Sequence, residues 1–182
     1  MFRIIKKSLK TGVVTGQHPD PTAPLPVISD DAAAKAACFR RSLTIREVDT
    51  GSCNACEMEM NALVNSVYDA ERFGVHIAAS PRHADALVVT GPVTCNMERA
   101  LKDAYKSTPD PKLIIALGDC AIDCGEFKGS YAVTGPVERH VPVDVKIPGC
   151  PPRPADILAA LRALRGERSE QPVLRHAQHE RK

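Results

Sequence analysis

Four cysteines of this chain lie in three segments that are far apart in the sequence, and their positions limit what the chain can fold into. The first segment holds Cys53-x-x-Cys56, the second holds Cys120, and the third holds Cys150 within Ile-Pro-Gly-Cys-Pro-Pro. A compact zinc knuckle takes its ligands from one or two tight turns, whereas these thiols can meet only in a folded domain. Such wide spacing is typical of a buried redox cluster.

The length and charge of the chain fit a single soluble domain without a nucleic-acid partner. It has 182 residues, and its 24 basic and 22 acidic side chains leave a net charge of +2. Aromatic residues make up only 4%, too few for a base-stacking platform. The apolar runs are too short for a transmembrane segment, and no export signal is evident. We therefore expect a cytoplasmic protein, in which seven cysteines indicate metal binding or redox chemistry rather than disulfides.

Three regions follow one another along the chain. Residues 1–41 hold a basic N-terminal segment and then a proline-rich linker, in which proline disfavours helix. Residues 42–165 have the composition of a core-forming domain. Residues 166–182 are polar and mixed in charge, which predicts a flexible tail. We therefore expect one domain with an extended segment before it and a polar tail after it.

Strand and helix patterns alternate in the central region. Short β-branched runs predict strands at residues 43–48, 75–79, 86–90, 113–117 and 143–147. Apolar periodicity predicts helices over residues 54–70, 97–105 and 154–164, the last opened by Pro154 and closed by Gly166. Such alternation indicates an α/β fold, with a mainly parallel open sheet that helices cover on both faces.

The cysteines follow the carboxyl ends of the expected strands. Cys53 comes after the strand at residues 43–48, Cys120 after residues 113–117, and Cys150 after residues 143–147. Open α/β sheets bind ligands beyond the carboxyl ends of their strands, at a topological switch point. Glycines shortly before these cysteines permit sharp turns and a close approach of backbone N–H groups to sulfur; they are Gly51, Gly118 and Gly149. The four thiols are therefore expected to converge on one site.

The motifs around these cysteines resemble those of a known family. They are GSCNACEMEMNAL, SPRHADALVVTGPVT followed by NMERAL, DPKLIIALGDCA, and VDVKIPGCPPRPADIL, and they cover roughly residues 42–165. The chain resembles the small, cluster-bearing subunit of the membrane-associated, energy-converting [NiFe]-hydrogenases, including that of formate hydrogenlyase. These subunits are grouped with the 20 kDa subunit of respiratory complex I.

The resemblance implies a flavodoxin-like domain that carries one [4Fe–4S] cluster, with Cys53, Cys56, Cys120 and Cys150 as its ligands. Thiolate is a suitable ligand because it is soft and anionic. The resemblance also implies that the catalytic NiFe site belongs to a separate large subunit, and that this chain relays electrons between that subunit and a ferredoxin-like iron–sulfur subunit. Membrane-arm subunits are expected to hold the complex at the cytoplasmic face of the membrane, since this chain shows no transmembrane segment of its own.

Two other functions remain open at this point. One is a complex I-like 20 kDa subunit that passes electrons to quinone. Its relatives typically have two adjacent cysteines at the first site, so the two residues between Cys53 and Cys56 favour the hydrogenase branch. The other is a structural zinc or thiol-redox domain that uses Cys53-x-x-Cys56 with Cys120-x-x-x-Cys124. That alternative leaves Cys150 and its proline-rich surroundings unexplained.

Other residues carry weaker signals. Cys124 is an alternative ligand in place of Cys120, whereas Cys95 and Cys38 are expected to be free thiols. Glu57 is a candidate for handling protons, but a carboxylate in the first turn also simply favours the helix dipole. Arg153 is a candidate hydrogen-bond donor near the cluster or toward a partner subunit. The histidines lack metal-ligand spacing and are expected on the surface or in the core; they are His76, His83 and His140.

Overall fold

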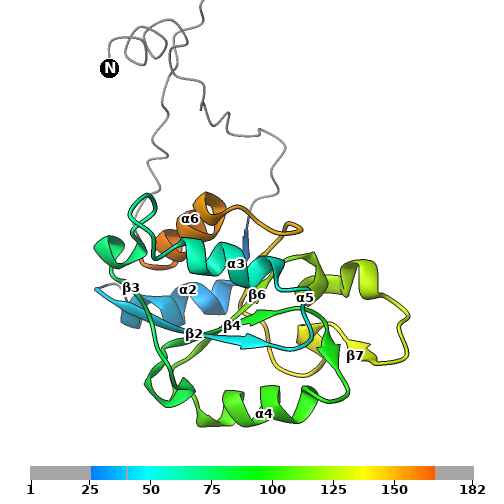
Figure 1. Ribbon diagram of the computed structural model, residues 1–182. Coiled ribbons are helices and arrows are strands. Elements are labelled where there is room, and N and C mark those ends of the chain that lie inside the picture. Colours follow the sequence, from blue (N-terminus) through cyan, green and yellow to red (C-terminus); the bar gives the residue numbers. More distant parts are fainter. Residues whose placement is uncertain (1–25, 40, 167–182) are drawn as a thin grey trace, which may run out of the picture.

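A six-stranded sheet runs through the computed structural model, which describes residues 26–39 and 41–166 (Figure 1). In spatial order its strands are β1 (Val27–Ile28), β8 (Val145–Ile147), β6 (Leu113–Leu117), β4 (Ala86–Thr90), β2 (Leu43–Asp49) and β3 (Val75–Ile77). Neighbouring strands are parallel, except that β1 is antiparallel to β8. Numbered along the chain, the parallel strands follow the flavodoxin-like order 2-1-3-4-5. The predicted fold class is therefore confirmed.

The central strands are buried on both faces, which explains their continuous apolar sequences. β4 and β6 are buried at every position, as is usual for strands inside a parallel sheet. Successive side chains point to opposite faces. Val88 and Ile115 belong to the hydrophobic cluster on one face, and Leu87 and Ile114 to the cluster on the other.

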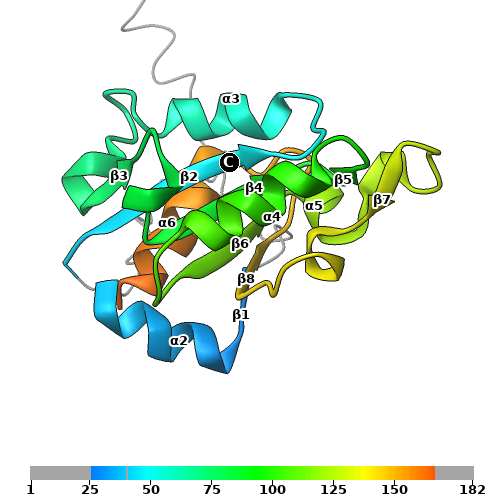
Figure 2. The same ribbon diagram turned by 90° about the horizontal axis from the view of Figure 1, so that it is seen from below.

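Helices cover both faces of the sheet, as predicted. One layer contains α2 (Asp30–Ala36), α3 (Ala55–Ala62) and α6 (Pro154–Leu164), and the other contains α4 (Glu98–Ser107) and α5 (Asp119–Asp123) (Figure 1 and Figure 2). Met60 and Leu161 of the first layer are buried in the hydrophobic cluster on one face of the sheet. Leu101 and Ala121 of the second layer are buried in the cluster on the other face. In the part of the chain that the structure describes, no helix is both long enough and apolar enough to cross a membrane.

Helix α3 is shorter than the helix predicted over residues 54–70. It ends at Ala62, because the chain then forms local bonds that compete with the helix. The side chain of Asn65 accepts hydrogen bonds from the N–H groups of Val67 (2.8 Å) and Tyr68 (3.0 Å). Helix α6, in contrast, spans the predicted residues, with Pro154 in its first turn.

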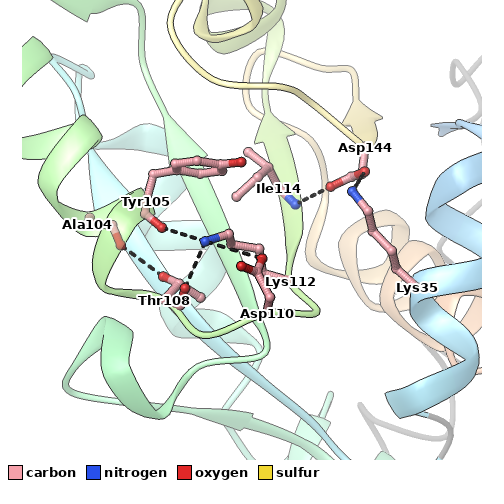
Figure 3. Close-up of polar contacts among 8 residues, drawn as sticks. All are labelled: Lys35, Ala104, Tyr105, Thr108, Asp110, Lys112, Ile114 and Asp144. Atoms are coloured by element: carbon pink, nitrogen blue, oxygen red, sulfur yellow. Dashed lines mark hydrogen bonds and ion pairs between the residues drawn. The ribbon is translucent and has the colours of Figure 1, made fainter.

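The folded part begins before residue 42, in the region that the sequence indicated as a linker. It holds β1, α2 and the 3₁₀ turn η1 (Ala37–Phe39). Lys35 Nζ lies 2.6 Å from Oδ1 of the buried Asp144, whose Oδ2 accepts a hydrogen bond from the N–H of Ile114 at 2.9 Å (Figure 3). These contacts tie α2 to the sheet. The basic segment near the N-terminus and the polar C-terminal tail lie outside the described residues.

Several short elements were not indicated by the sequence patterns. β5 (Val93–Thr94) and β7 (Val133–Gly135) form a second, two-stranded antiparallel sheet. The 3₁₀ turns are η2 (Ala70–Phe73), η3 (Pro81–His83), η4 (Gly125–Phe127) and η5 (Val137–Arg139).

At the end of α4, Lys112 Nζ donates hydrogen bonds to the carbonyl oxygens of Tyr105 (2.9 Å) and Thr108 (2.8 Å) (Figure 3). Lys112 thereby satisfies carbonyl groups that the helix leaves free.

Candidate metal centre

The four predicted cysteines lie at the carboxyl ends of parallel strands. Cys53 follows β2, and Cys56 lies in the first turn of α3. Cys120 lies in the first turn of α5, directly after β6, and Cys150 follows β8. β2 and β4 are neighbours at the point where the strand order reverses, which is the switch point of this fold. The sheet therefore carries all three cysteine segments to the same edge, as expected.

Two of the four thiols, those of Cys56 and Cys120, have raised pKa values to which neighbouring site cysteines contribute. Burial raises the pKa of Cys56 from 9.0 to about 12, with further contributions, in decreasing order, from Glu57, Cys120, Cys53 and Cys150. Burial also raises the pKa of Cys120, followed by the effects of Cys150 and Cys53. The contributions of the neighbouring groups are repulsion between negative charges. A bound metal cation would reverse this repulsion and favour the thiolates.

Cys124 occupies a different environment. It is 5% exposed and ends α5 in a left-handed conformation, with φ of 73°. Burial and Asp123 raise its pKa, whereas Lys128 and Arg139 lower it. It lines a groove of about 410 Å³ together with both of these basic residues. Cys124 thus interacts with charged side chains of the groove. The four predicted ligands, in contrast, interact among themselves.

The remaining two cysteines lie on other elements. Cys95 is exposed and lines a second groove beside α4, together with Glu98 and Lys102. Cys38 is exposed in η1. Neither residue is among the groups that affect the pKa of Cys56 or Cys120.

Gly118 leaves the space in which the Cys56 sulfur lies. It precedes α5 with φ of +86°, and a Cβ at this position would be 2.7 Å from Cys56 Sγ. The same Cβ would be 3.3 Å from the carbonyl oxygen of Gly149. Glycine is needed here for the backbone conformation and also for the close approach. Because Gly118 contacts both other loops, it marks the place where the three cysteine segments meet.

Local hydrogen bonds hold the first cysteine loop. Oδ1 of Asp49 accepts hydrogen bonds from the N–H groups of Gly51 and Ser52, both at 2.8 Å. Ser52 Oγ in turn accepts a hydrogen bond from the N–H of Asn54 at 3.0 Å. Asn54 has a left-handed conformation, with φ of 69°, and leads into α3. The position of Cys53 is therefore set by the residues on either side of it.

Four cysteine sulfurs are a donor set of the kind that holds an iron–sulfur cluster. Across residues 26–39 and 41–166, no three Cys, His, Asp or Glu side chains lie close enough together to hold one ion. A zinc ion, with Zn–S bonds of about 2.3 Å, needs its sulfurs roughly 4 Å apart. A cluster binds its thiolates through different iron atoms, so its ligands are spaced more widely. Cys53 and Cys150 are exposed while Cys56 and Cys120 are half-buried, so the site opens onto the surface.

A buried carboxylate lies beside the thiols. Glu57 is 8% exposed, and among the described residues neither of its oxygens has a hydrogen-bond partner. Burial raises the pKa of Glu47 in β2, and Glu57 raises it further. Glu57 is also the largest charged contributor to the raised pKa of Cys56. Glu57 is also the acidic residue in the first turn of α3, so a contribution to the helix dipole and an effect on the neighbouring thiol are both consistent with its position.

The other residues singled out from the sequence are Arg153 and three histidines. Arg153 Nε forms an ion pair with Asp156 Oδ2 at 2.8 Å, in the first turn of α6. His76 and His83 are exposed. The His140 side chain is largely buried, and its Nε2 lies 3.1 Å from Thr134 Oγ1. The histidines thus occupy surface and core positions, as expected.

Two features of the site were missed by reasoning from the sequence. The N–H of Glu126 donates a hydrogen bond to the sulfur of Cys120, and this bond acts to lower the pKa of Cys120. The carboxylate of Asp119 accepts a hydrogen bond from the N–H of Gly149 at 2.8 Å. Both contacts depend on which turns and loops meet in the folded chain. The only local signal was an acidic residue placed between Gly118 and Cys120.

We expect Cys56 to react with iodoacetamide much more slowly than Cys53 and Cys150 in the metal-free chain. With a pKa of about 12 instead of 9.0, Cys56 is a thiolate at pH 8 roughly a thousandth as often as a thiol with the ordinary pKa. Mass spectrometry of peptides after timed alkylation measures the three rates, and the urea-unfolded chain serves as the control. Similar rates for Cys56 in the folded and unfolded chains would contradict the expectation.

Several known proteins are similar to this chain across the site. The family model described as NADH ubiquinone oxidoreductase, 20 Kd subunit, matches residues 53–164, which include all four site cysteines. The probable membrane-bound hydrogenase subunit mbhJ of Pyrococcus furiosus is 50% identical over 118 residues, covering 65% of this chain and 71% of that protein. Formate hydrogenlyase subunit 7 of Escherichia coli is 45% identical over 140 residues, covering 74% of this chain and 55% of that protein. A chain of the archaeal membrane-bound sulfane sulfur reductase superposes with a TM-score of 0.63 at 32% identity, covering 74% of each chain.

Proposed function

Because this chain belongs to the NADH ubiquinone oxidoreductase 20 kDa subunit family, we propose that it is the electron-transfer small subunit of a multi-subunit, membrane-associated [NiFe]-hydrogenase of the formate hydrogenlyase type. Its relatives are subunits of oxidoreductase complexes. In this proposal the chain relays electrons between a ferredoxin-like iron–sulfur subunit and the large subunit that carries the NiFe site. The chain itself supplies no catalytic residue.

The proposed cofactor is one [4Fe–4S] cluster held by Cys53, Cys56, Cys120 and Cys150. The observation that carries this proposal is that the three cysteine segments meet at one edge of the sheet, where Cys53, Cys120 and Cys150 all contribute to the raised pKa of Cys56. The resemblance to this family implies a cluster of this kind.

Each part of the site has a role in this proposal. A bound [4Fe–4S] cluster would supply transfer of one electron at a time. Cys56 and Cys120 would hold it from the protein side, and the exposed Cys53 and Cys150 would hold it from the surface side. The N–H of Glu126 would stabilise negative charge on the Cys120 sulfur through its hydrogen bond.

The surface position of the site agrees with electron transfer to another chain. A redox site that lies at the surface can come close to a second redox centre when a partner subunit covers it. The partners proposed here are the large NiFe subunit, a ferredoxin-like subunit and membrane-arm subunits. Through them the chain would lie peripherally on the cytoplasmic face of the membrane.

Metal analysis of anaerobically purified protein tests the proposal. We expect about four irons and about four acid-labile sulfides per chain, together with an electron paramagnetic resonance (EPR) signal that appears on reduction. Zinc without sulfide would overturn the cluster and support the structural alternative. Purification of the intact complex tests the second half of the proposal. A copurifying large subunit with two Cys-x-x-Cys pairs supports a hydrogenase, whereas a large subunit lacking them indicates the quinone-linked alternative.

A further inference from the structure

Asp119 and Gly149 form a reciprocal pair of hydrogen bonds between two of the cysteine loops. The N–H of Asp119 donates to the carbonyl oxygen of Gly149 at 2.9 Å, and the N–H of Gly149 donates to Oδ1 of Asp119 at 2.8 Å. Asp119 directly precedes Cys120, and Gly149 directly precedes Cys150. The two bonds thus join the neighbours of two proposed ligands.

These bonds extend the pairing of β6 and β8 past the ends of the strands. The last paired residues are Leu117 and Ile147, and the N–H of Gly118 still donates to the Ile147 carbonyl oxygen at 2.8 Å. The ladder then loses its regular geometry, since Gly118 and Gly149 have φ of +86° and +135°. From this point one backbone bond, from Asp119 to Gly149, and the carboxylate of Asp119 keep the two loops in register.

The carboxylate has a second effect because of its charge. Asp119 directly precedes Cys120, and its negatively charged carboxylate lies between the loops of Cys120 and Cys150, where it accepts the hydrogen bond from Gly149. The same charge opposes the addition of an electron to any redox group held by that sulfur. Its removal is therefore expected to make reduction easier.

We propose that Asp119 is a positioning residue, which fixes the Cys150 thiol relative to Cys120 and holds the reduction potential of the site at a lower value. The inference rests on the proposed cluster. Its two parts depend on different properties of one side chain: the hydrogen bond needs an acceptor oxygen, and the effect on the potential needs the negative charge.

Two substitutions of Asp119 separate these properties. Asp119→Asn retains an acceptor oxygen for the Gly149 N–H but removes the charge. We expect it to keep about four irons per chain and to show a more positive midpoint potential. Asp119→Ala removes the acceptor as well. We expect its iron content to fall toward about three per chain, with the EPR signal of a three-iron cluster, as Cys150 no longer holds its position.

Asp123 provides a matched control on the same helix. Its Oδ1 accepts a hydrogen bond from the N–H of Gly125 at 2.9 Å and is exposed, so Asp123→Ala loses a local carboxylate bond without touching the loop of Cys150. We expect this variant to keep the wild-type iron content and EPR signal. Iron loss in Asp123→Ala equal to that in Asp119→Ala would overturn the positioning role. An unchanged potential in Asp119→Asn would overturn the effect of charge.

A measurement on the metal-free chain separates this inference from the proposed function. Hydrogen exchange reports on the Gly149 amide, which Asp119→Ala leaves without its acceptor; we expect loss of protection there in Asp119→Ala and retention in Asp119→Asn. Failure of the wild-type protein to bind iron would refute the proposed function, whatever the exchange result. Unchanged protection in Asp119→Ala would refute the positioning role even when the cluster is present.

Discussion

The Cys150→Ser variant is expected to fold but to lose the four-iron cluster. A serine hydroxyl is a hard donor with little tendency to ionise, so it is a poor substitute for a soft thiolate on iron. Cys150 is exposed, and its replacement removes no core packing, so the defect should be confined to the site. Iron and sulfide per chain, with EPR of the reduced protein, measure the loss, while circular dichroism confirms that the chain is folded.

The Cys124→Ser variant is the matched control for this experiment. Cys124 is buried beside Lys128 and Arg139, so the substitution places a hydroxyl in a buried position and costs about 1 kcal/mol or somewhat more. The iron content should nevertheless remain that of the wild type. The opposite pattern, with iron lost in Cys124→Ser and kept in Cys150→Ser, would show that Cys124 belongs to the ligand set and Cys150 does not.

Replacement of Gly118 by Ala is expected to damage both the fold and the site. The added Cβ would lie 2.7 Å from Cys56 Sγ, so either the sulfur or the backbone must move. Overpacking of this kind costs about 1–3 kcal/mol, in addition to about 1–2 kcal/mol for a non-glycine residue in the left-handed region. Urea unfolding of the metal-free chain measures the free energy of unfolding, and the iron content per chain reports whether the site still binds iron.

Gly129→Ala separates the two causes. Gly129 has φ of +83°, close to the +86° of Gly118, but a Cβ at Gly129 meets nothing within 4 Å. Its substitution therefore carries the backbone cost alone. We expect Gly118→Ala to be the less stable variant and to be the one that loses iron. Equal losses of stability in both variants, with iron kept in both, would show that the space beside the Cys56 sulfur is not required.

The place of the site was predictable because it depends on the ends of strands. Regular apolar runs at residues 86–90 and 113–117 located β4 and β6 to the residue. Once such runs form a parallel sheet, residues that follow them must lie at one edge. The order of strands and the cysteines that follow them were therefore enough to predict that Cys53, Cys120 and Cys150 lie at the same edge.

The contacts within the site were not predictable in the same way. Helix α3 was predicted too long because Asn65 ends the helical segment through a side-chain bond, which leaves no mark on the apolar period. The elements β1 and α2 were missed because their burial depends on residues far along the chain, such as Asp144. For the same reason, the bond between Asp119 and Gly149 became visible only in the folded structure.

The pairing of β1 with β8 has a consequence for the nascent chain. Val27 pairs with Lys146. A strand near the start of the described chain therefore forms its backbone pairs with a strand near its end. Chains emerge from the ribosome with the N-terminus first, so β1 must remain unpaired until β8 has been translated. Cys150 emerges at the same stage. All four thiols are therefore available together only when most of the described chain has been made, which would put delivery of iron and sulfide to the proposed cluster late in biosynthesis.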